Sequence, residues 1–337
     1  MVYTMEQKIA IIGKGNVGSC LLQLLNDKKD EIKKTFDILY KVIAIFEYDG
    51  ALINENGIEL EEVLKKGDKF RELPYWKKDM VAKEQISKID LDICIETTPT
   101  NPNTGEPAIS HIIEALCNKI NVIASNKAPF YLRYKKIKDL AQEQGCIVKY
   151  EATVASGVPI LSIREGLIGN TITSIKAILN GTCNYILSRM AAEGVSLQIA
   201  LKEAQELGYA EADPTLDIEG YDAAGKLVIL ANELLGWSKN IKDVKIKGIK
   251  DITAQTIELA KSDGFVVKHL AIAENNQLIV EPRLVERDSP LNISGTLNVV
   301  ELQTKYAGPI VIMGRGAGGF EAASGILNDM INISLKK

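Results

Sequence analysis

The part of the sequence best suited to chemistry is a run of acidic side chains that ends in one lysine. The stretch Gly208–Lys226 reads GYAEADPTLDIEGYDAAGK. Asp222 and Lys226 are four residues apart, so one helix would present both on the same face. There the carboxylate would favour the charged ammonium, which could stabilise a growing oxyanion and then donate a proton. A solvated acidic loop or an exposed ion pair has the same local pattern. The carboxylates of the run are Glu211, Asp213, Asp217, Glu219 and Asp222.

A glycine-rich turn near the start of the chain is typical of a dinucleotide site. GKGNVG fits G-x-G-x-x-G, follows the apolar run KIAIIG and precedes the helical pattern NVGSCLLQLLN. The glycines allow a tight turn and a close approach of the backbone to a pyrophosphate, which the first N–H groups of the helix would bind. A glycine-rich connector is the alternative. The residues expected at the cofactor are Gly13, Gly15, Asn16, Val17 and Gly18.

Glu47, at the end of the next predicted strand, is expected to meet the ribose of the adenosine. A carboxylate at this point accepts a hydrogen bond from the 2′-hydroxyl and repels a 2′-phosphate, which favours NAD. Lys14 in the glycine turn and Lys41 before the strand could each reach a 2′-phosphate, so NADP stays open. A strand-end charge that faces water is the simpler alternative for Glu47.

Polar side chains follow two further predicted strands. Thr97 and Thr98 come after LDICIE, and Ser125 and Lys127 come after NVIA. The carboxyl ends of parallel strands face the ligand in a doubly wound sheet, so the hydroxyls could contact the nicotinamide ribose. Lys127 would then point into the crevice between two domains. A Thr-Pro turn and a solvated lysine are the alternatives.

The order of the predicted elements indicates an α/β protein. Apolar strands alternate with helices up to about residue 150, which predicts a Rossmann-type, doubly wound parallel sheet covered on both faces. The pattern then becomes α+β, with a hairpin formed by FVVKHLAIA and QLIVEPRLV. The last strand, glycine turn and helix resemble the start of the chain. We therefore expect a dinucleotide-binding domain of residues 1–150 plus 310–337 and a second domain of residues 151–309.

Composition argues against several classes of partner. The 337 residues include 40 basic and 44 acidic ones, a net charge of −4, and no basic stripe, so nucleic acid is not an expected partner. No apolar run reaches about 18 residues and no signal peptide precedes the first strand, so no membrane association is expected. The five scattered cysteines form no CxxC pair, which favours free thiols and a cytoplasmic location.

Only two histidines occur in the chain, which limits the mechanisms available. His111 lies in a helical pattern and His269 in a strand pattern, and both are expected to be structural. Acid–base chemistry would therefore fall to lysine or carboxylate side chains.

The sequence resembles the homoserine dehydrogenases over nearly its whole length. The resemblance rests on GKGNVG, TTPTNPNTGEP, SNKAPF, YEATVASGVPI, NGTCNYIL, GRGAGG and, above all, LGYAEADPTLDIEGYDAAGKL. Members of this family reduce L-aspartate 4-semialdehyde to L-homoserine with NADH or NADPH, and catalyse the reverse, on the path to threonine, isoleucine and methionine. The resemblance implies that the second domain is catalytic and forms a homodimer.

The resemblance also gives roles to the acidic run. It implies that Lys226 is the first choice for the proton-transfer group, while Lys127 could polarise the carbonyl or share the transfer. Because a neutral lysine must accept the alcohol proton, homoserine oxidation is expected to be fastest at alkaline pH. The residues expected at the substrate are Glu211, Asp217, Asp222, Gly181 and Thr182, and Gly208 and Gly318 are expected to complete the cofactor site.

A cation site is the last feature of the resemblance. The small residues after Glu151 could present several carbonyl oxygens beside one carboxylate, which suits a hard cation. The family carries a monovalent cation, usually sodium, near its domain junction, where it would stiffen the hinge. The matching positions are Glu151, Val154, Ser156 and Val158.

Two departures from the family and two rival functions bear on the interpretation. Cys183 stands where the family commonly has threonine, and a thiol is a weaker hydrogen-bond partner than a hydroxyl. The chain ends soon after the returning helix, without the regulatory domain of some members, so little feedback inhibition by threonine is expected. The rivals are another amino-acid dehydrogenase of the same architecture and a dinucleotide-sensing protein without catalysis.

Overall fold

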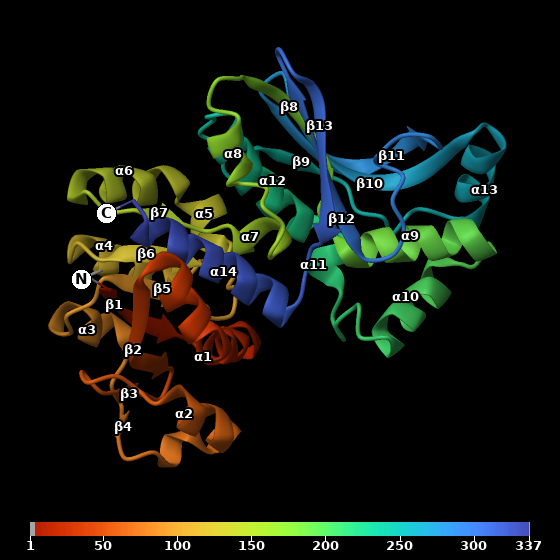
Figure 1. Ribbon diagram of the computed structural model, residues 1–337. Coiled ribbons are helices and arrows are strands. Elements are labelled where there is room, and N and C mark those ends of the chain that lie inside the picture. Colours follow the sequence, from red (N-terminus) through yellow and green to blue (C-terminus); the bar gives the residue numbers. More distant parts are fainter. Residues whose placement is uncertain (1–3, 337) are drawn as a thin grey trace. The chain divides into compact units, whose positions relative to one another are not determined.

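The computed structural model describes residues 4–336. The chain forms two compact units: unit 1 comprises Met1–Gly157 with Gly318–Lys337, and unit 2 comprises Val158–Ala317 (Figure 1). Within residues 4–336, no helix is both long enough and apolar enough to cross a lipid bilayer.

Unit 1 is built around a seven-stranded sheet with the order β4-β3-β2-β1-β5-β6-β7. The five strands from β2 to β7 in this order run parallel, which confirms the predicted Rossmann-type sheet, and β3 and β4 add an antiparallel edge that was not predicted. The strand order reverses at β1, where ligands bind in such sheets. The strands are β1 (Met5–Ile12), β2 (Ile38–Glu47), β3 (Gly50–Ile53), β4 (Trp76–Lys78), β5 (Ile93–Glu96), β6 (Asn121–Ala124) and β7 (Val148–Lys149).

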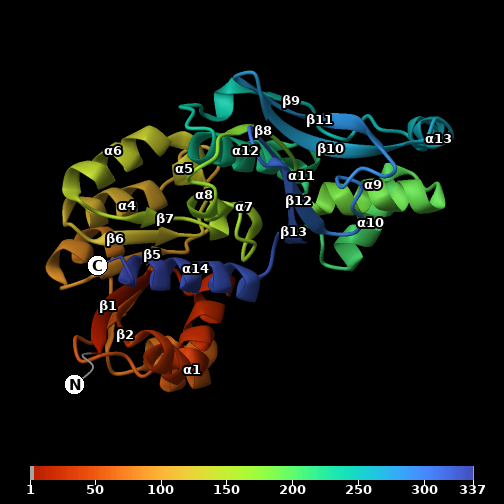
Figure 2. The ribbon, with the colours of Figure 1, turned by 45° about the horizontal axis from the view of Figure 1, so that its top comes forward.

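Helices cover this sheet on both sides. The helices α1 and α14 pack against each other, although they lie at opposite ends of the sequence (Figure 2). Ile9 and Ala10 of β1 point to opposite faces and both are fully buried, so neither face is open at this strand. The helices of unit 1 are α1 (Asn16–Phe36), α2 (Leu60–Lys66), α3 (Ala82–Gln85), α4 (Ala108–Cys117), α5 (Ala128–Leu132), α6 (Tyr134–Gln144), α7 (Ala152–Ala155) and α14 (Gly319–Ser334), with short 3-10 helices η1 (Gly67–Glu72) and η2 (Ile86–Lys88).

Unit 2 contains a six-stranded sheet with the order β13-β12-β8-β10-β11-β9. The β10–β11 hairpin confirms the sequence prediction, and its turn, Asn275–Asn276, has positive φ at both residues, as a type I′ turn requires. The strands are β8 (Ile172–Ile178), β9 (Val244–Ile246), β10 (Phe265–Glu274), β11 (Gln277–Glu286), β12 (Leu297–Thr304) and β13 (Gly308–Arg315).

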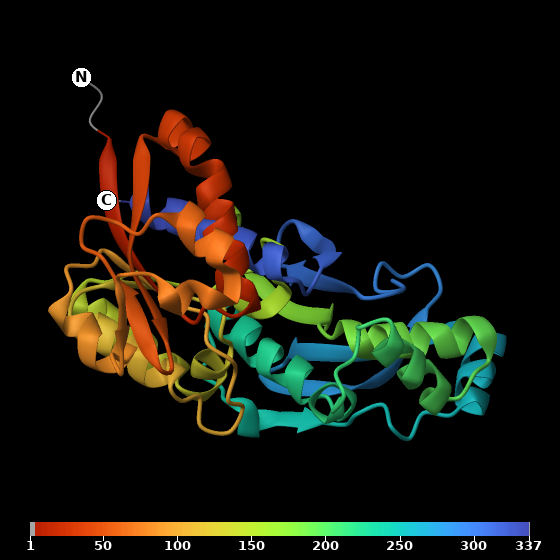
Figure 3. The same cartoon turned by 90° about the horizontal axis from the view of Figure 1, so that it is seen from below.

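The two faces of this sheet differ. Neighbouring residues Leu302, Ile175, Ala273 and Leu278 form a buried row across four strands, and α9 and α12 pack against the sheet (Figure 3). The opposite row contains partly exposed side chains, which are described below. The helices of unit 2 are α8 (Ile163–Gly166), α9 (Gly181–Glu193), α10 (Leu197–Glu206), α11 (Thr215–Ile218), α12 (Tyr221–Leu234) and α13 (Ala254–Ser262), with the 3-10 helix η3 (Ile241–Asp243).

Candidate active site

The glycine turn of unit 1 has the close backbone packing that a dinucleotide site needs. A Cβ on Gly18 would lie 2.0 Å from the Gly13 carbonyl oxygen, and Gly13 itself has φ +95°. A Cβ on Gly15 would meet no atom within 4 Å, so open space adjoins the turn there. α1 starts at Asn16, which Val17 follows, and no side chain caps it. Its first N–H groups are therefore available to an anion. The turn therefore fits a pyrophosphate.

Thr97 fastens the end of β5 to this turn. Its hydroxyl lies 2.7 Å from the Gly13 carbonyl oxygen and 3.0 Å from that of Ile12, and the side chain is buried. The hydroxyl therefore donates its hydrogen bond to the backbone of the turn. Its contact with the nicotinamide ribose stays a prediction.

A buried carboxylate organises the ends of β5 and β6. Glu96 Oε1 accepts hydrogen bonds from the N–H and the hydroxyl of Thr98, and Oε2 lies 2.6 Å from His111 Nδ1. Asn126 donates to the Thr98 carbonyl over 3.1 Å and accepts from the Ala128 N–H over 3.2 Å. Sequence reasoning assigned no role to Glu96, and it treated His111 as structural.

Ser125 and Lys127 flank this arrangement. The Ser125 N–H donates to the Glu96 carbonyl over 3.0 Å, so the residue continues directly from the sheet. Lys127 is the residue that precedes α5, and its side chain is partly buried. Both residues therefore lie at the carboxyl end of β6, as the sequence predicts.

Glu47 lies against the glycine turn. Its Oε1 accepts a hydrogen bond from the Lys14 N–H, and its Oε2 lies 3.7 Å from Arg71 Nη2. Lys41 is six residues earlier on β2, about 20 Å along a strand, and its Nζ lies 3.4 Å from Glu6. The possibility that Lys41 reaches a 2′-phosphate is therefore wrong, while Lys14 stays at the correct end of the strand.

The acidic run of unit 2 places Asp222 and Lys226 on the first turns of α12. Lys226 Nζ lies 2.8 Å from Asp222 Oδ2 and donates to the Leu179 carbonyl oxygen over 2.8 Å. The two side chains are only 12% and 10% exposed. This burial argues against the exposed ion pair that the spacing alone allowed, because a surface pair would remain in water.

Asn180 joins the two central carboxylates of the run. Its Nδ2 lies 2.6 Å from Asp217 Oδ1 and 3.0 Å from Asp222 Oδ2, and its Oδ1 accepts from the Cys183 N–H. Burial, and then the charge of Asp222, raise the pKa of Asp217. Sequence reasoning missed Asn180, although an asparagine before the helical pattern GTCNYIL is a typical N-cap.

The start of α9 forms one side of this group. A Cβ on Gly181 would lie 2.7 Å from the Thr296 carbonyl oxygen, so only glycine fits there. The Thr182 hydroxyl donates to the Tyr209 carbonyl over 2.8 Å. The Cys183 thiol, whose pKa is raised by burial, lies 3.1 Å from the Asp217 carbonyl oxygen. The thiol therefore contacts the backbone, and the variation from threonine leaves the carboxylates in place.

The remaining acidic residues have separate environments. Asp213 accepts from the N–H and hydroxyl of Thr215, and Glu219 pairs with Lys250 at 3.0 Å. Glu211 is exposed, and its backbone oxygen accepts a hydrogen bond from Gln205. The structure therefore brings Asp217 and Asp222 together and leaves Glu211 at the surface. Gly208 follows α10, and Gly318 immediately precedes α14.

The expected cation ligands lie around α7. Glu151 is buried, and its N–H donates to Asp329 over 2.9 Å. Ser156 is also buried and has φ +54°. Among residues 4–336 no group of three or more histidine, cysteine or acidic side chains could hold a metal. Any cation here would therefore depend on backbone oxygens, including those of Val154 and Val158.

Comparison with family models gives two matches. The model described as homoserine dehydrogenase matches residues 159–331. The model described as glutamate/leucine/phenylalanine/valine dehydrogenase matches residues 2–124, which lie entirely within unit 1. The second match therefore covers the dinucleotide-type sheet and none of the acidic run.

Relatives and solved structures match the whole chain. A homoserine dehydrogenase of Methanocaldococcus jannaschii is 46% identical over 96% of this chain and 98% of the relative, and an NAD(+)-dependent homoserine dehydrogenase of Pseudomonas canavaninivorans is 36% identical over 97% and 96%. The crystal structure of a protein assigned as a homoserine dehydrogenase from Archaeoglobus fulgidus has a TM-score of 0.89 at 40% identity and covers 97% of this chain and 99% of its own. A hyperthermophilic archaeal homoserine dehydrogenase in complex with NADPH has a TM-score of 0.86 at 28% identity, with 99% of both chains covered.

Proposed function

The chain belongs to the homoserine dehydrogenase family, and from that premise we propose that Lys226 moves the proton when L-aspartate 4-semialdehyde is reduced to L-homoserine. It is an NAD(P)-dependent oxidoreductase that acts on a CH–OH group. The observation that carries the assignment of Lys226 is its buried pairing with Asp222 at 2.8 Å. We assign proton transfer to this lysine because it is largely buried beside a carboxylate within the motif that carries the family resemblance.

The groups around Lys226 set its orientation. Asp222 and the Leu179 carbonyl hold the ammonium from two sides. A bound nicotinamide supplies or accepts the hydride. In the reductive direction Lys226 stabilises the growing negative charge on the substrate oxygen and donates its proton there. In the oxidative direction the neutral amine accepts that proton, so homoserine oxidation increases with pH.

Substrate binding is assigned to the residues around Asn180. We propose that Asp217 binds the substrate ammonium, with the backbone of Gly181 and the hydroxyl of Thr182 beside it. Support comes from the Asn180 amide, which holds Asp217 and Asp222 in one group. Glu211 is the second expected carboxylate and would act from an exposed position. Removing the charge of Asp217 should therefore raise KM for homoserine more than removing that of Glu211.

Cofactor binding is assigned to unit 1, and substrate binding to unit 2. The pyrophosphate would lie on the turn Gly13–Gly18, the adenosine ribose at Glu47, and the nicotinamide ribose near Thr98 and Ser125, with Thr97 supporting the turn. Lys127 would polarise the carbonyl or share proton transfer. Gly208 and Gly318 are proposed to border the cofactor. Isothermal titration of NAD and NADP into variants of the turn tests this assignment, because unchanged affinity would contradict it.

The test of Lys226 compares two lysines that each pair with a carboxylate of the acidic run. Lys226→Ala should lower kcat by about 100-fold or more while the fold survives, as native circular dichroism would show. Lys250→Ala is the matched control, because Lys250 pairs with Glu219 of the same run but is exposed. Steady-state rates with homoserine and each cofactor, from pH 6 to pH 10, should fall only for the first variant. Near-normal turnover of Lys226→Ala, or a flat wild-type pH profile, would reverse the assignment, and Lys127→Ala then tests the other lysine.

A sodium ion is proposed at Glu151, Val154, Ser156 and Val158. Support comes from the buried carboxylate of Glu151 and from the positive φ of Ser156, which turns the chain within a run of small residues. The ion would stiffen the segment and take no part in proton transfer. Replacing sodium by choline at constant ionic strength should lower thermal stability, and an unchanged melting temperature would contradict the site.

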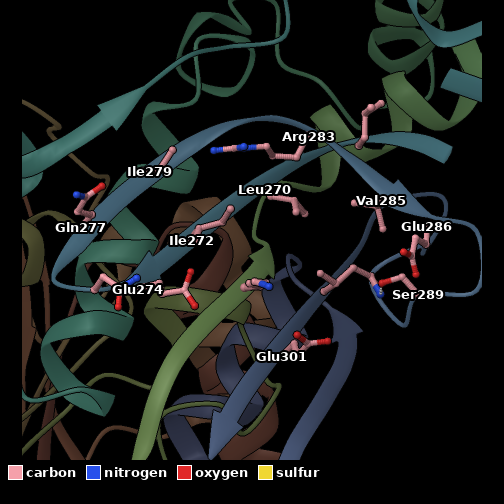
Figure 4. A pocket seen from close by; sticks show the side chains of 14 residues that line it. Leu270, Ile272, Glu274, Gln277, Ile279, Arg283, Val285, Glu286, Ser289 and Glu301 are labelled. Atoms are coloured by element: carbon pink, nitrogen blue, oxygen red, sulfur yellow. Dashed lines mark hydrogen bonds between the residues drawn. The ribbon is translucent and has the colours of Figure 1, made fainter. Parts of the chain in front are cut away.

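The proposed assembly is a homodimer formed through the β-sheet of unit 2. The row opposite the buried one consists of Val311, Glu301, Lys176, Ile272 and Ile279, one residue from each of five adjacent strands. We call this row the open face. Part of it lines an open hollow of about 490 Å³, into which Leu270, Ile272 and Glu301 project (Figure 4). The row combines apolar side chains with the opposite charges of Glu301 and Lys176, which suits a self-complementary contact.

The cellular role follows from the reaction. We propose that the enzyme works in the synthesis of threonine, methionine and isoleucine. A cytoplasmic location is proposed because all five cysteines are free, and Cys94 and Cys183 are buried thiols. Auxotrophy for threonine and methionine after loss of the gene, and its relief by homoserine, would test the role; growth without these supplements would contradict it.

A further inference from the structure

An arginine that the proposed mechanism does not use lies beside the end of β2. Arg71 of η1 donates to Asp49 through Nε at 2.9 Å and through Nη2 at 3.0 Å, which makes a two-pronged contact with the carboxylate. Its Nη2 also lies 3.7 Å from Glu47 Oε2. The guanidinium therefore lies beside the carboxylate that is proposed to meet the adenosine ribose.

Lys14 brings a second cation to the same place. Its N–H donates to Glu47, while its Nζ lies 3.2 Å from the Gly67 carbonyl oxygen and 4.7 Å from the centre of the Phe70 ring. Two cationic side chains thus surround the carboxylates of Glu47 and Asp49, and their charges nearly balance. A cofactor with an extra phosphate would meet cations here as well as the carboxylate that repels it.

Aromatic rings pack against the guanidinium of Arg71, but its contact with Asp49 is open to exchange. The guanidinium carbon lies 4.8 Å from the centre of the Phe70 ring and 5.3 Å from that of Trp76. The side chains of Arg71 and Asp49 are each 33% exposed, so their contact is reached by water. A planar fork of N–H donors binds a phosphate with two parallel hydrogen bonds, as it binds a carboxylate.

We propose that Arg71 is a specificity-determining residue that lets this enzyme accept NADP as well as NAD. With NAD the guanidinium stays on Asp49, and Glu47 accepts the 2′-hydroxyl. With NADP the guanidinium exchanges Asp49 for the 2′-phosphate. The inference rests on the proposed binding of the dinucleotide at GKGNVG. The preference between the cofactors is thus set by competition between the Asp49 carboxylate and the 2′-phosphate for the Arg71 guanidinium.

The experiment measures binding separately from turnover. Isothermal titration gives Kd for NADP and NAD with the wild type, Arg71→Gln, Asp49→Asn and Lys69→Gln. Arg71→Gln should weaken NADP by about 10-fold or more and change NAD by less than about 3-fold, because only NADP loses a bidentate partner. Asp49→Asn should strengthen the binding of NADP. The Arg71 guanidinium then loses its carboxylate partner, and a negative charge that repels the 2′-phosphate is removed. Lys69→Gln is the matched control, since Lys69 is an exposed cation of the same η1.

The outcomes separate this inference from the proposed function. Equal weakening of both cofactors by Arg71→Gln, an unchanged Kd for NADP, an equal effect of Lys69→Gln, or a wild type with no measurable affinity for NADP would each overturn the role of Arg71. Retained affinity for NAD in Arg71→Gln also shows that the variant is folded. Normal binding of both cofactors without homoserine turnover would contradict the proposed function and leave the role of Arg71 supported.

Discussion

At the scale of single residues, two buried lysines of unit 2 have different partners and therefore different properties. Lys226 has a carboxylate partner, Asp222, at 2.8 Å. Lys268 is 3% exposed, and within residues 4–336 it has no acidic partner. Its Nζ donates to the Ile293 carbonyl and lies 3.3 Å from Asn184 Oδ1. Burial lowers the pKa of Lys268 to about 8. The first lysine suits proton transfer, and the second fastens a loop to α9.

The lowered pKa of Lys268 predicts that the free energy of unfolding depends on pH. Between pH 8 and pH 10.5 the unfolded chain binds a proton that the folded chain does not, so stability increases as pH rises through this window. Below pH 8 the lysine is charged in both states and the full cost of its burial remains. The effect is at most about 3 kcal/mol. Urea unfolding at pH 7.5, 9 and 10.5 measures it.

The control for this prediction separates Lys268 from the other groups that titrate at alkaline pH. Lys268→Met should flatten the pH dependence, whereas Lys176→Met, on the partly exposed row of the same sheet, should preserve it. If Lys268→Met and the wild type show the same slope, the lysine is not the source.

At the scale of elements, the sequence predicts the strands and helices that have a local periodic pattern, but few of the contacts between residues far apart in the chain. The parallel sheet and the β10–β11 hairpin follow from apolar periodicity and turn residues, because both signals are local. The motif Gly13–Gly18 and the pair Asp222–Lys226 are also local, and the structure shows a tight turn and a close ion pair. The edge strands β3 and β4 were missed, since the strands are short and pair only in the folded sheet.

The pairing of Glu96 with His111 shows why the rest was not predictable. Fifteen residues separate them, and ICIE and SHIIEAL indicate only a strand and a helix. Nothing in either stretch specifies that the imidazole meets the carboxylate. Asn180 differs, because its N-cap position was visible in the sequence. Its second role, as a bridge between Asp217 and Asp222, depends on tertiary structure.

The contact between β5 and α4 predicts a strongly coupled double-mutant cycle. Glu96→Leu leaves the Thr98 N–H and His111 Nδ1 without their buried acceptor and should lower the free energy of unfolding by about 3 kcal/mol. His111→Leu should cost a similar amount. The double variant should cost clearly less than the sum, because each single change leaves the other partner unsatisfied. Urea unfolding of the four proteins measures the coupling, and additive effects would show that the two side chains act independently.

At the scale of the whole molecule, the proposed function assigns the cofactor to unit 1 and the substrate to unit 2. Unit 1 has the glycine turn and the polar strand ends, and unit 2 has the carboxylates and Lys226. The Glutamate/Leucine/Phenylalanine/Valine dehydrogenase model matches only unit 1, while the homoserine dehydrogenase model matches 159–331. Unit 1 thus resembles more than one family of dehydrogenases, whereas the match to the homoserine dehydrogenase model includes all of unit 2 except Val158. The same unit has the open face, whose use the sequence alone did not specify.

Disrupting the open face should separate the proposed dimer without unfolding unit 2. Ile272 lies in this row between Lys176 and Ile279, so Ile272→Glu would place an unpaired charge at the centre of the contact. The wild type should have the mass of a dimer at micromolar concentration in size-exclusion chromatography with light scattering, and Ile272→Glu that of a monomer. Ile199→Glu, at an exposed apolar residue of α10 in the same unit, should remain dimeric. A monomeric wild type, or a dimeric Ile272→Glu with native circular dichroism, would show that the open face is not the contact, because a buried unpaired charge costs more than a contact of this kind can tolerate.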